Sequence, residues 1–205
     1  MDYKDYIREE YCDVYVQERD NLEDRLIEAK YNLLFLKMVH ERSEFYRNNH
    51  NITEKFEIMV IMRRIYVTVA WELALQIKAF TNDNAKDSLT INKLQNKICQ
   101  YIKPEKKEEY KNLIRPITKA SAWKNCIKIV SNISDYRNKI VGHNIINTPE
   151  LTFDINEADF VISQYEDLFK VLSFQNKRYA ERVTDLNNEK ANFITIFLDA
   201  LLPQH

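Results

Sequence analysis

The residues best suited to chemistry lie in one short segment, residues 137–143, with the sequence RNKIVGH. Arginine keeps its charge at any ordinary pH and can hold a phosphate group through fork-like hydrogen bonds. Histidine titrates near neutral pH and can exchange protons with a substrate. Arg137 and His143 together would therefore supply the minimum that RNA cleavage needs without a metal ion.

Arg137 interrupts the apolar row of a predicted helix. At 100° per residue, the apolar side chains around it fall along one stripe: Cys126, Ile129, Val130, Ile133, Ile140 and Val141. The opposite side of the helix carries Lys128, Asn132, Asp135 and Lys139. A guanidinium in an apolar stripe needs a partner. Two interpretations of Arg137 stay open: an ion pair with a neighbouring carboxylate such as Glu72 or Asp83, and an anion site at the helix end, at an interface with a second subunit.

The only glycine of the chain, Gly142, directly precedes His143. Helices often end at a glycine in the left-handed conformation. Such an end would release His143 from the helical rotation, which would otherwise splay it about 120° away from Arg137. We therefore expect the helix to end at Gly142, so that both side chains can face the same ligand.

The segment resembles the signature of the HEPN superfamily, in which an arginine followed by a polar residue precedes a histidine with four to six residues between them. Here Asn138 is the polar residue and five residues intervene. The apolar second helix, Asp83 at its end and the following Ser88-Leu89 also look like the HEPN branch associated with abortive phage infection. The resemblance covers roughly residues 10 to 185.

The resemblance implies a helical bundle that dimerises around the motif and places two Arg-His pairs in one cleft. His143 would then be the general acid or base, Arg137 would hold the phosphate, and Asn138 would orient the site. One His143 would deprotonate a ribose 2′-hydroxyl while its mate protonates the leaving 5′-oxygen, giving a 2′,3′-cyclic phosphate. The implied activity is that of a metal-independent endoribonuclease, a toxin or antiviral effector with an antitoxin or defence-system partner.

One departure from the family bears on that partner. HEPN toxins paired with nucleotidyltransferase antitoxins often carry a tyrosine shortly after the motif arginine, and residues 140–144 contain none. This disfavours that pairing and leaves a stand-alone defence nuclease. The alternative is a non-catalytic HEPN protein that binds a nucleotide, an RNA or a partner protein. Retention of both Arg137 and His143 favours catalysis, because a binding module could lose either.

The histidines, tryptophans and lysines outside the motif are expected to have structural roles or to lie at the surface. His40 and His50 have no His/Glu metal pattern and are expected at the surface. Trp71 and Trp123 are expected to anchor a core or an interface instead of stacking on bases. The lysines of residues 103–111 alternate with glutamates and predict a solvated face. The apolar run at residues 193–198 is expected to pack in the bundle, with a dimer contact as the second interpretation.

Composition limits the function classes. With 45% hydrophobic and 30% charged residues, the 205-residue chain is expected to form one globular domain over residues 1–205. A single glycine excludes a P-loop or a Rossmann domain. A net charge of −1 restricts any RNA contact to a local patch. Cys12, Cys99 and Cys126 lack CxxC spacing, which argues against a disulfide framework and a zinc site.

Nothing in the sequence predicts a cofactor, a signal peptide or a membrane span, and we expect a cytoplasmic protein. The scarcity of glycine and proline predicts an all-α, antiparallel bundle of about five to seven helices. The first helix is expected over about residues 3–48, with a buried row made of Leu22, Leu26, Ala29, Leu33, Leu36 and Val39. The second, over about 53–80, is the most apolar and is placed at the centre of the bundle.

The rest of the chain is predicted as five further helices. A helix spans about residues 88–102, and Pro104 begins the next one. Pro116 kinks or splits residues 105–142, so that the motif-bearing helix covers about residues 117–142. C-terminal helices cover about residues 157–202, the first over about 157–183 with Asn156 as its cap and the last starting at Asn187.

Overall fold

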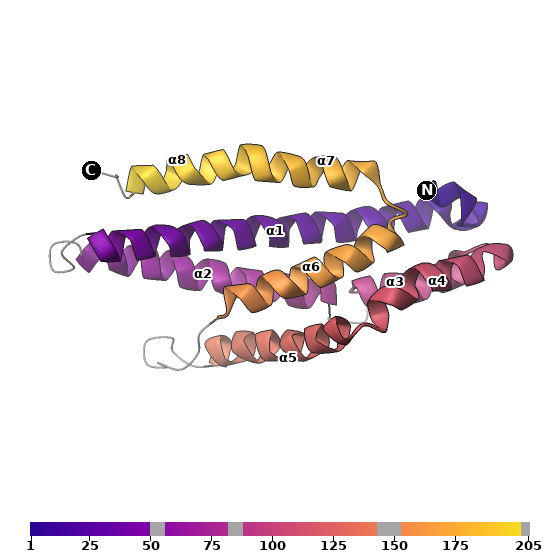
Figure 1. Ribbon diagram of the computed structural model, residues 1–205, viewed down its shortest axis with the longest axis horizontal. Coiled ribbons are helices and arrows are strands. Elements are labelled where there is room, and N and C mark those ends of the chain that lie inside the picture. Colours follow the sequence, from indigo (N-terminus) through magenta and orange to yellow (C-terminus); the bar gives the residue numbers. More distant parts are fainter. Residues whose placement is uncertain (50–55, 82–87, 143–152, 202–205) are drawn as a thin grey trace.

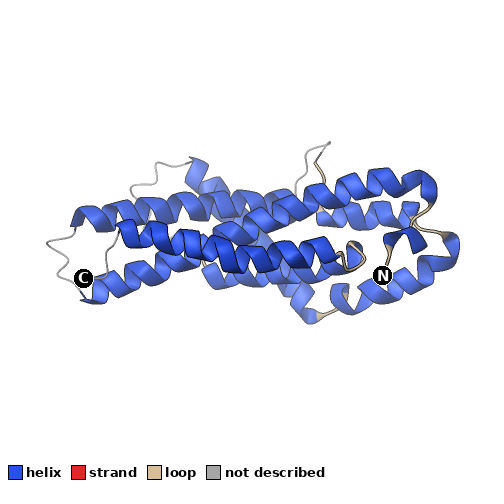
Figure 2. Cartoon of the chain, turned by 90° about the horizontal axis from the view of Figure 1, so that it is seen from above, coloured by secondary structure: helices blue, strands red, loops and turns tan. Residues whose placement is uncertain are grey.

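The computed structural model describes residues 1–49, 56–81, 88–142 and 153–201, apart from the side chains of residues 49, 136–142 and 190. Over these ranges the chain is the predicted all-α helical bundle, with its long helices side by side along one axis (Figure 1). No strand occurs in them, and helices fill nearly the whole view in Figure 2.

The helices follow one another with short connections. In chain order they are α1 (Cys12–Asn49), α2 (Phe56–Thr81), α3 (Ile91–Tyr101), α4 (Lys107–Thr118), α5 (Ser121–Gly142), α6 (Ile155–Leu172), α7 (Lys177–Asp185) and α8 (Ala191–Leu201). A π-helical turn, Leu186–Lys190, joins α7 to α8, so the last helix begins later than the predicted Asn187. Figure 1 shows α7 and α8 running as one rod along α1.

The predicted buried row of α1 is confirmed. All six residues are at most 5% exposed: Leu22, Leu26, Ala29, Leu33, Leu36 and Val39. They recur at helical spacing, so one side of a long helix is apolar while the rest stays charged. This row lets α1 pack against several helices at once, with α2 and α6 on one side and the α7–α8 rod on the other (Figure 1).

The prediction that the first helix starts at residue 3 is wrong. Residues before α1 form two short 3-10 turns, Tyr3–Asp5 and Glu9–Tyr11. Between them the backbone turns away from helical bonding, because Arg8 N donates to Tyr101 O at 2.9 Å and Lys103 N donates to Tyr6 O at 2.8 Å. These bonds to a distant segment bury Ile7 and tie the N-terminus to the end of α3.

Only the C-terminal half of α2 lies at the centre of the bundle. Leu73, Ile77 and Phe80 are fully buried, as predicted, whereas Ile61 is 47% exposed and Phe56 is 67% exposed. Figure 1 shows why: α1 and α2 extend beyond the end of α5, so the N-terminal half of α2 lacks that neighbour. The prediction of a central place therefore fails at Ile61, whereas Met62, its neighbour, is buried in a second cluster with Val39 and Ile194.

Pro104 and Pro116 lie at the boundaries of α4, near the helix ends predicted for them. Pro104 is the first residue of a 3-10 turn, Pro104–Lys106, that leads into α4. Pro116 lies in the last turn of α4, and the helix ends two residues later at Thr118. The predicted split of residues 105–142 is confirmed, because α5 then begins at Ser121.

The C-terminal region differs from the prediction of one helix over residues 157–183. Asp154, and not Asn156, caps α6, since its carboxylate accepts from the N–H groups of Asn156 and Glu157. The helix ends at Leu172, and Phe174 and Gln175 adopt φ values of 54° and 56°. These left-handed conformations cost free energy in residues other than glycine, and Phe174 offsets the cost by becoming buried.

Candidate active site

α5 carries Arg137 and Asn138 of the predicted motif, and Gly142 is the last residue of this helix within the described ranges. The apolar stripe is confirmed, because Cys126 is fully buried and Val130 and Ile133 are each 5% exposed. The opposite side is exposed at Lys128, Asn132 and Asp135, also as predicted. Arg137 follows Ile133 by four residues in the same helix, so its backbone continues the buried row.

The structure describes the three predicted site residues to different extents. Arg137 and Asn138 belong to α5, but their side chains lie outside the described part of the structure, and His143 lies outside it entirely. Of the two carboxylates considered as partners of Arg137, Asp83 is also outside the described ranges, and Glu72 is a half-buried residue of α2. The contacts of Arg137, Asn138 and His143 therefore stay predictions.

An open cavity of about 530 Å³ adjoins the segment that follows the motif in sequence. Its walls come from α1, α2 and the start of α6: Lys37, His40, Glu41, Tyr66, Phe153, Asp154, Ile155 and Asn156. The volume is within the range of sites that hold small organic ligands. This cavity is the described hollow nearest in sequence to His143.

Tyr66 connects the cavity wall to the start of α6. Its hydroxyl donates a hydrogen bond to Phe153 O at 3.3 Å. Burial, and secondarily the negative charge of Asp154, raises the pKa of Tyr66. The phenol therefore stays protonated at neutral pH and offers the cavity a hydrogen-bonding group without charge.

The charged groups of the cavity are partly engaged with one another. Lys37 Nζ lies 2.8 Å from Asp159 of α6, and the Asp154 carboxylate caps that helix. His40 is exposed, as predicted, with its ring 6.2 Å from the ring of Tyr66. Sequence analysis missed that His40 borders a cavity, since only the packing of α1 against α6 brings it there.

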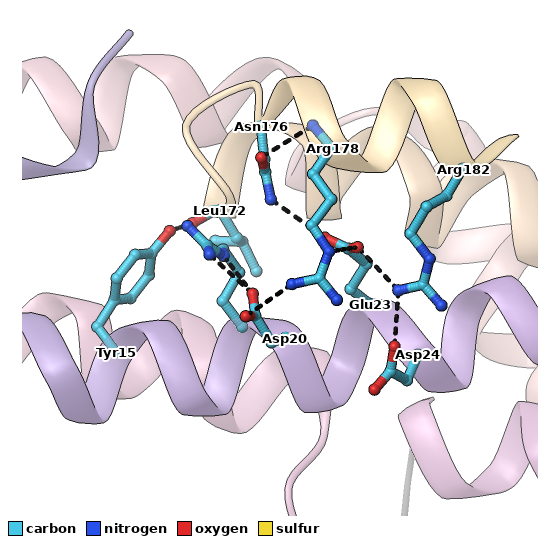
Figure 3. A network of polar contacts seen from close by, with 9 residues as sticks. Tyr15, Asp20, Glu23, Asp24, Leu172, Asn176, Arg178 and Arg182 are labelled. Carbon is cyan, nitrogen blue, oxygen red and sulfur yellow. Dashed lines mark hydrogen bonds and ion pairs between the residues drawn. The ribbon is translucent and has the colours of Figure 1, made fainter. Parts of the chain in front are cut away.

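The densest group of paired charges lies between α1 and α7 (Figure 3). The side chain of Glu23 is fully buried and pairs with Arg178 at 3.2 Å and with Arg182 at 2.8 Å. These arginines also reach Asp20 at 3.0 Å and Asp24 at 2.6 Å. Because the buried carboxylate is fully engaged, the cluster fastens α7 to α1 and leaves Glu23 no free group for a substrate.

The structural interpretations of several other residues are confirmed. Trp123 is buried, with its ring 4.9 Å from the ring of Tyr165, so it anchors the core. The three cysteines are free. Burial raises the pKa of Cys126 to about 12, so its thiol stays protonated and unreactive. Within the described ranges, no group of His, Cys, Asp and Glu residues could hold a metal ion.

The lysines of residues 103–111 form the predicted solvated, ion-paired face. Lys106 lies 2.9 Å from Glu109, and Lys111 lies 2.5 Å from Glu108. Each pair joins residues three apart on exposed helix surface, an arrangement that contributes little to stability.

Comparison of the chain with protein-family models, curated proteins and solved structures found no match. The HEPN resemblance therefore rests on residues 137–143 and on their place in the chain. None of the helices in the described ranges is both long and apolar enough to cross a lipid bilayer.

Proposed function

We propose that the chain is a HEPN-type, metal-independent endoribonuclease of a bacterial toxin–antitoxin or abortive-infection system. One feature supports this most: His143 directly follows Gly142, the only glycine of the chain and the last residue of α5 within the described ranges. A helix end frees the next residue from the 100° rotation, which is what Arg137 and His143 need to act on one phosphate.

The chemistry is attack of a ribose 2′-hydroxyl on the adjacent phosphorus. In a dimer with two motifs in one cleft, one His143 takes the proton of the 2′-hydroxyl as the new P–O bond forms. The other His143 donates a proton to the 5′-oxygen as its bond to phosphorus breaks. Arg137 stabilises the charge on the phosphorane, and Asn138 orients the site. The products are a 2′,3′-cyclic phosphate and a 5′-hydroxyl.

The proposed partners follow from this chemistry. They are an RNA substrate, a second copy of the chain that completes the cleft, and an antitoxin or another component of the defence system. An exposed apolar surface on α8, where Phe193 is 62% and Ile196 is 69% exposed, offers a contact for a protein partner on the side of α1 away from α5 (Figure 1). Exposed apolar groups of this size are typical of contact surfaces.

A second candidate function is non-catalytic binding of a nucleotide. The cavity bordered by His40 and Tyr66 favours it, because its volume suits a small polar ligand and its walls offer both hydrogen-bonding and charged groups. In this case the motif would hold a phosphate without cleaving RNA.

Expression in bacteria distinguishes the two functions. The wild type is expected to slow growth and fragment total RNA, whereas His143→Ala and Arg137→Ala are expected to do neither. All three purified proteins should melt at the same temperature, which excludes unfolding as the cause. His40→Ala is the control and should remain toxic. Equal growth and intact RNA with the wild type and His143→Ala would contradict the ribonuclease and favour nucleotide binding.

A further inference from the structure

Residues 110–134 contain five basic residues and no acidic one: Lys111, Arg115, Lys119, Lys124 and Lys128. The rest of the chain, with 25 of the 30 Lys and Arg residues and all 31 Asp and Glu residues, has a net charge of −6. Helix surfaces of soluble proteins usually mix both signs. This stretch, which runs from Tyr110 in α4 through the first half of α5, therefore differs from the rest of the molecule, including the acidic first turn of α4 at Glu108 and Glu109.

The five side chains of this stretch are all exposed. Lys111 pairs with Glu108, but the other four form no ion pair with any residue that the structure describes. Lys124 and Lys128 are four residues apart, about 6 Å along the helix axis. Like charges at this spacing repel each other and weaken a helix. A bound polyanion would neutralise Lys124 and Lys128 and remove this repulsion.

The packing of α5 keeps this row toward solvent. Trp123, Cys126 and Val130 are buried against the bundle, so Lys124 and Lys128 lie on the opposite side of the helix. Short hydrogen-bonding residues accompany them on the exposed surface, among them Asn125. In Figure 1, α4 and α5 follow each other along the bundle toward the end at Gly142.

We propose that the basic face, defined as Lys111, Arg115, Lys119, Lys124 and Lys128, binds the phosphate backbone of RNA and leads the strand to the motif at the end of α5. This inference rests on the proposed function. Lysine, arginine and asparagine are the side chains that commonly contact nucleic-acid phosphates. Lys124 and Lys128 lie on α5, the helix that also carries Arg137, and Lys111 and Arg115 lie on the preceding helix, α4.

The composition of the basic face favours an RNA backbone over other anionic partners. Both aromatic residues of the stretch, Tyr110 and Trp123, are buried, so no ring is exposed for base stacking. Ile127 is the one large apolar side chain exposed on this face within the described ranges, too little for insertion into a lipid surface. Binding is therefore expected to be independent of sequence and strongly dependent on salt.

The test compares two double variants in a His143→Ala background, which leaves the RNA intact. Lys124→Gln/Lys128→Gln removes two charges of the basic face. Lys4→Gln/Lys177→Gln removes two exposed lysines elsewhere that likewise form no ion pair within the described ranges. Fluorescence anisotropy measures binding of a single-stranded RNA oligonucleotide over a range of salt concentrations.

Loss of the two phosphate contacts should lower the slope of log K against log salt by about 1.4 and weaken binding roughly tenfold at about 0.15 M salt. The control variant should bind like its His143→Ala parent. Equal binding by both variants, or an equal loss in both, would overturn the basic face as the RNA surface. Binding of the parent to phosphatidylserine vesicles but not to RNA would overturn it as well.

The basic face and the proposed ribonuclease can fail separately. If Lys124→Gln/Lys128→Gln selectively loses RNA binding while the protein with His143 intact cleaves no RNA, the basic face stands and the ribonuclease fails. If the protein with His143 intact cleaves RNA while the double variant binds RNA normally, the ribonuclease stands and the basic face fails.

Discussion

Glu23 is the residue whose environment departs furthest from water among the charged residues described. Its side chain has no exposed surface, and a carboxylate in such a place is stable only when it is paired. Arg178 and Arg182 supply the charge, and Asn176 donates a further hydrogen bond at 3.1 Å (Figure 3). The residue therefore fixes where α7 docks on α1, and through α7 where α8 begins.

Glu23→Ala is expected to lower the free energy of unfolding by about 2 kcal/mol, because Arg178 and Arg182 lose their buried partner. The loss stays below that of a fully buried pair, since both arginines are partly exposed and keep Asp20 and Asp24. Urea unfolding measures the change. The control is Glu181→Ala, an exposed position on α7, which should change stability by less than about 0.5 kcal/mol. Equal effects of the two substitutions would contradict the fastening role of Glu23.

Features of single helices that depend on local residue spacing could be predicted from the sequence. The row of α1 could be predicted because apolar residues recur every three or four positions. The extent of α5 up to Gly142, the last of its described residues, could be predicted from the helical spacing of its apolar stripe. The absence of acidic residues from 110 to 134 can be read from the sequence, but the exposure of the five basic side chains depends on how α4 and α5 pack.

Features that depend on contacts between distant segments could not be predicted. The corner at Phe174 and Gln175 has no glycine to mark it, and it forms because Phe174 packs 4.8 Å from the ring of Tyr6. The start of α1 is set by backbone bonds to residues 101–103. The cavity beside His40 needs α1, α2 and the start of α6 together, so no local pattern in the sequence marks it.

The register of α8 can be tested with one substitution at two neighbouring positions. Ile194 is 1% exposed and packs with Val39 and Met62, whereas Ile196 is 69% exposed. Ile194→Ala should lower the free energy of unfolding by about 2–4 kcal/mol, through lost burial and a cavity. Ile196→Ala, the matched control, should change it by about 0.5 kcal/mol or less. A larger loss at Ile196 than at Ile194 in thermal or urea unfolding would contradict this register.

Across the whole molecule, burial shifts several groups that titrate in alkali. It raises the pKa of Tyr15, Tyr110 and Tyr179, and it raises the pKa values of Tyr165 and Cys126 to about 12. In the unfolded chain such groups lose their protons between about pH 8.5 and 10. Above that range the folded state holds more protons than the unfolded state, so stability falls as the pH rises.

The free energy of unfolding is therefore expected to be fully present below about pH 8 and to fall from about pH 9 toward pH 12. Urea unfolding at a series of pH values measures this slope. Tyr165→Phe removes one of the titrating groups and should make the slope shallower. Equal stability near pH 8 and near pH 11 would show that these groups are not held protonated by the fold.

We propose that Arg137 and His143 cleave RNA without a metal ion. The most direct measurement incubates the purified protein with RNA in the presence of EDTA and identifies the product ends. We expect cleavage to 2′,3′-cyclic phosphate and 5′-hydroxyl ends, no cleavage of the same RNA with 2′-O-methyl groups, and none by His143→Ala. Cleavage that EDTA abolishes, or that His143→Ala retains, would contradict the claim.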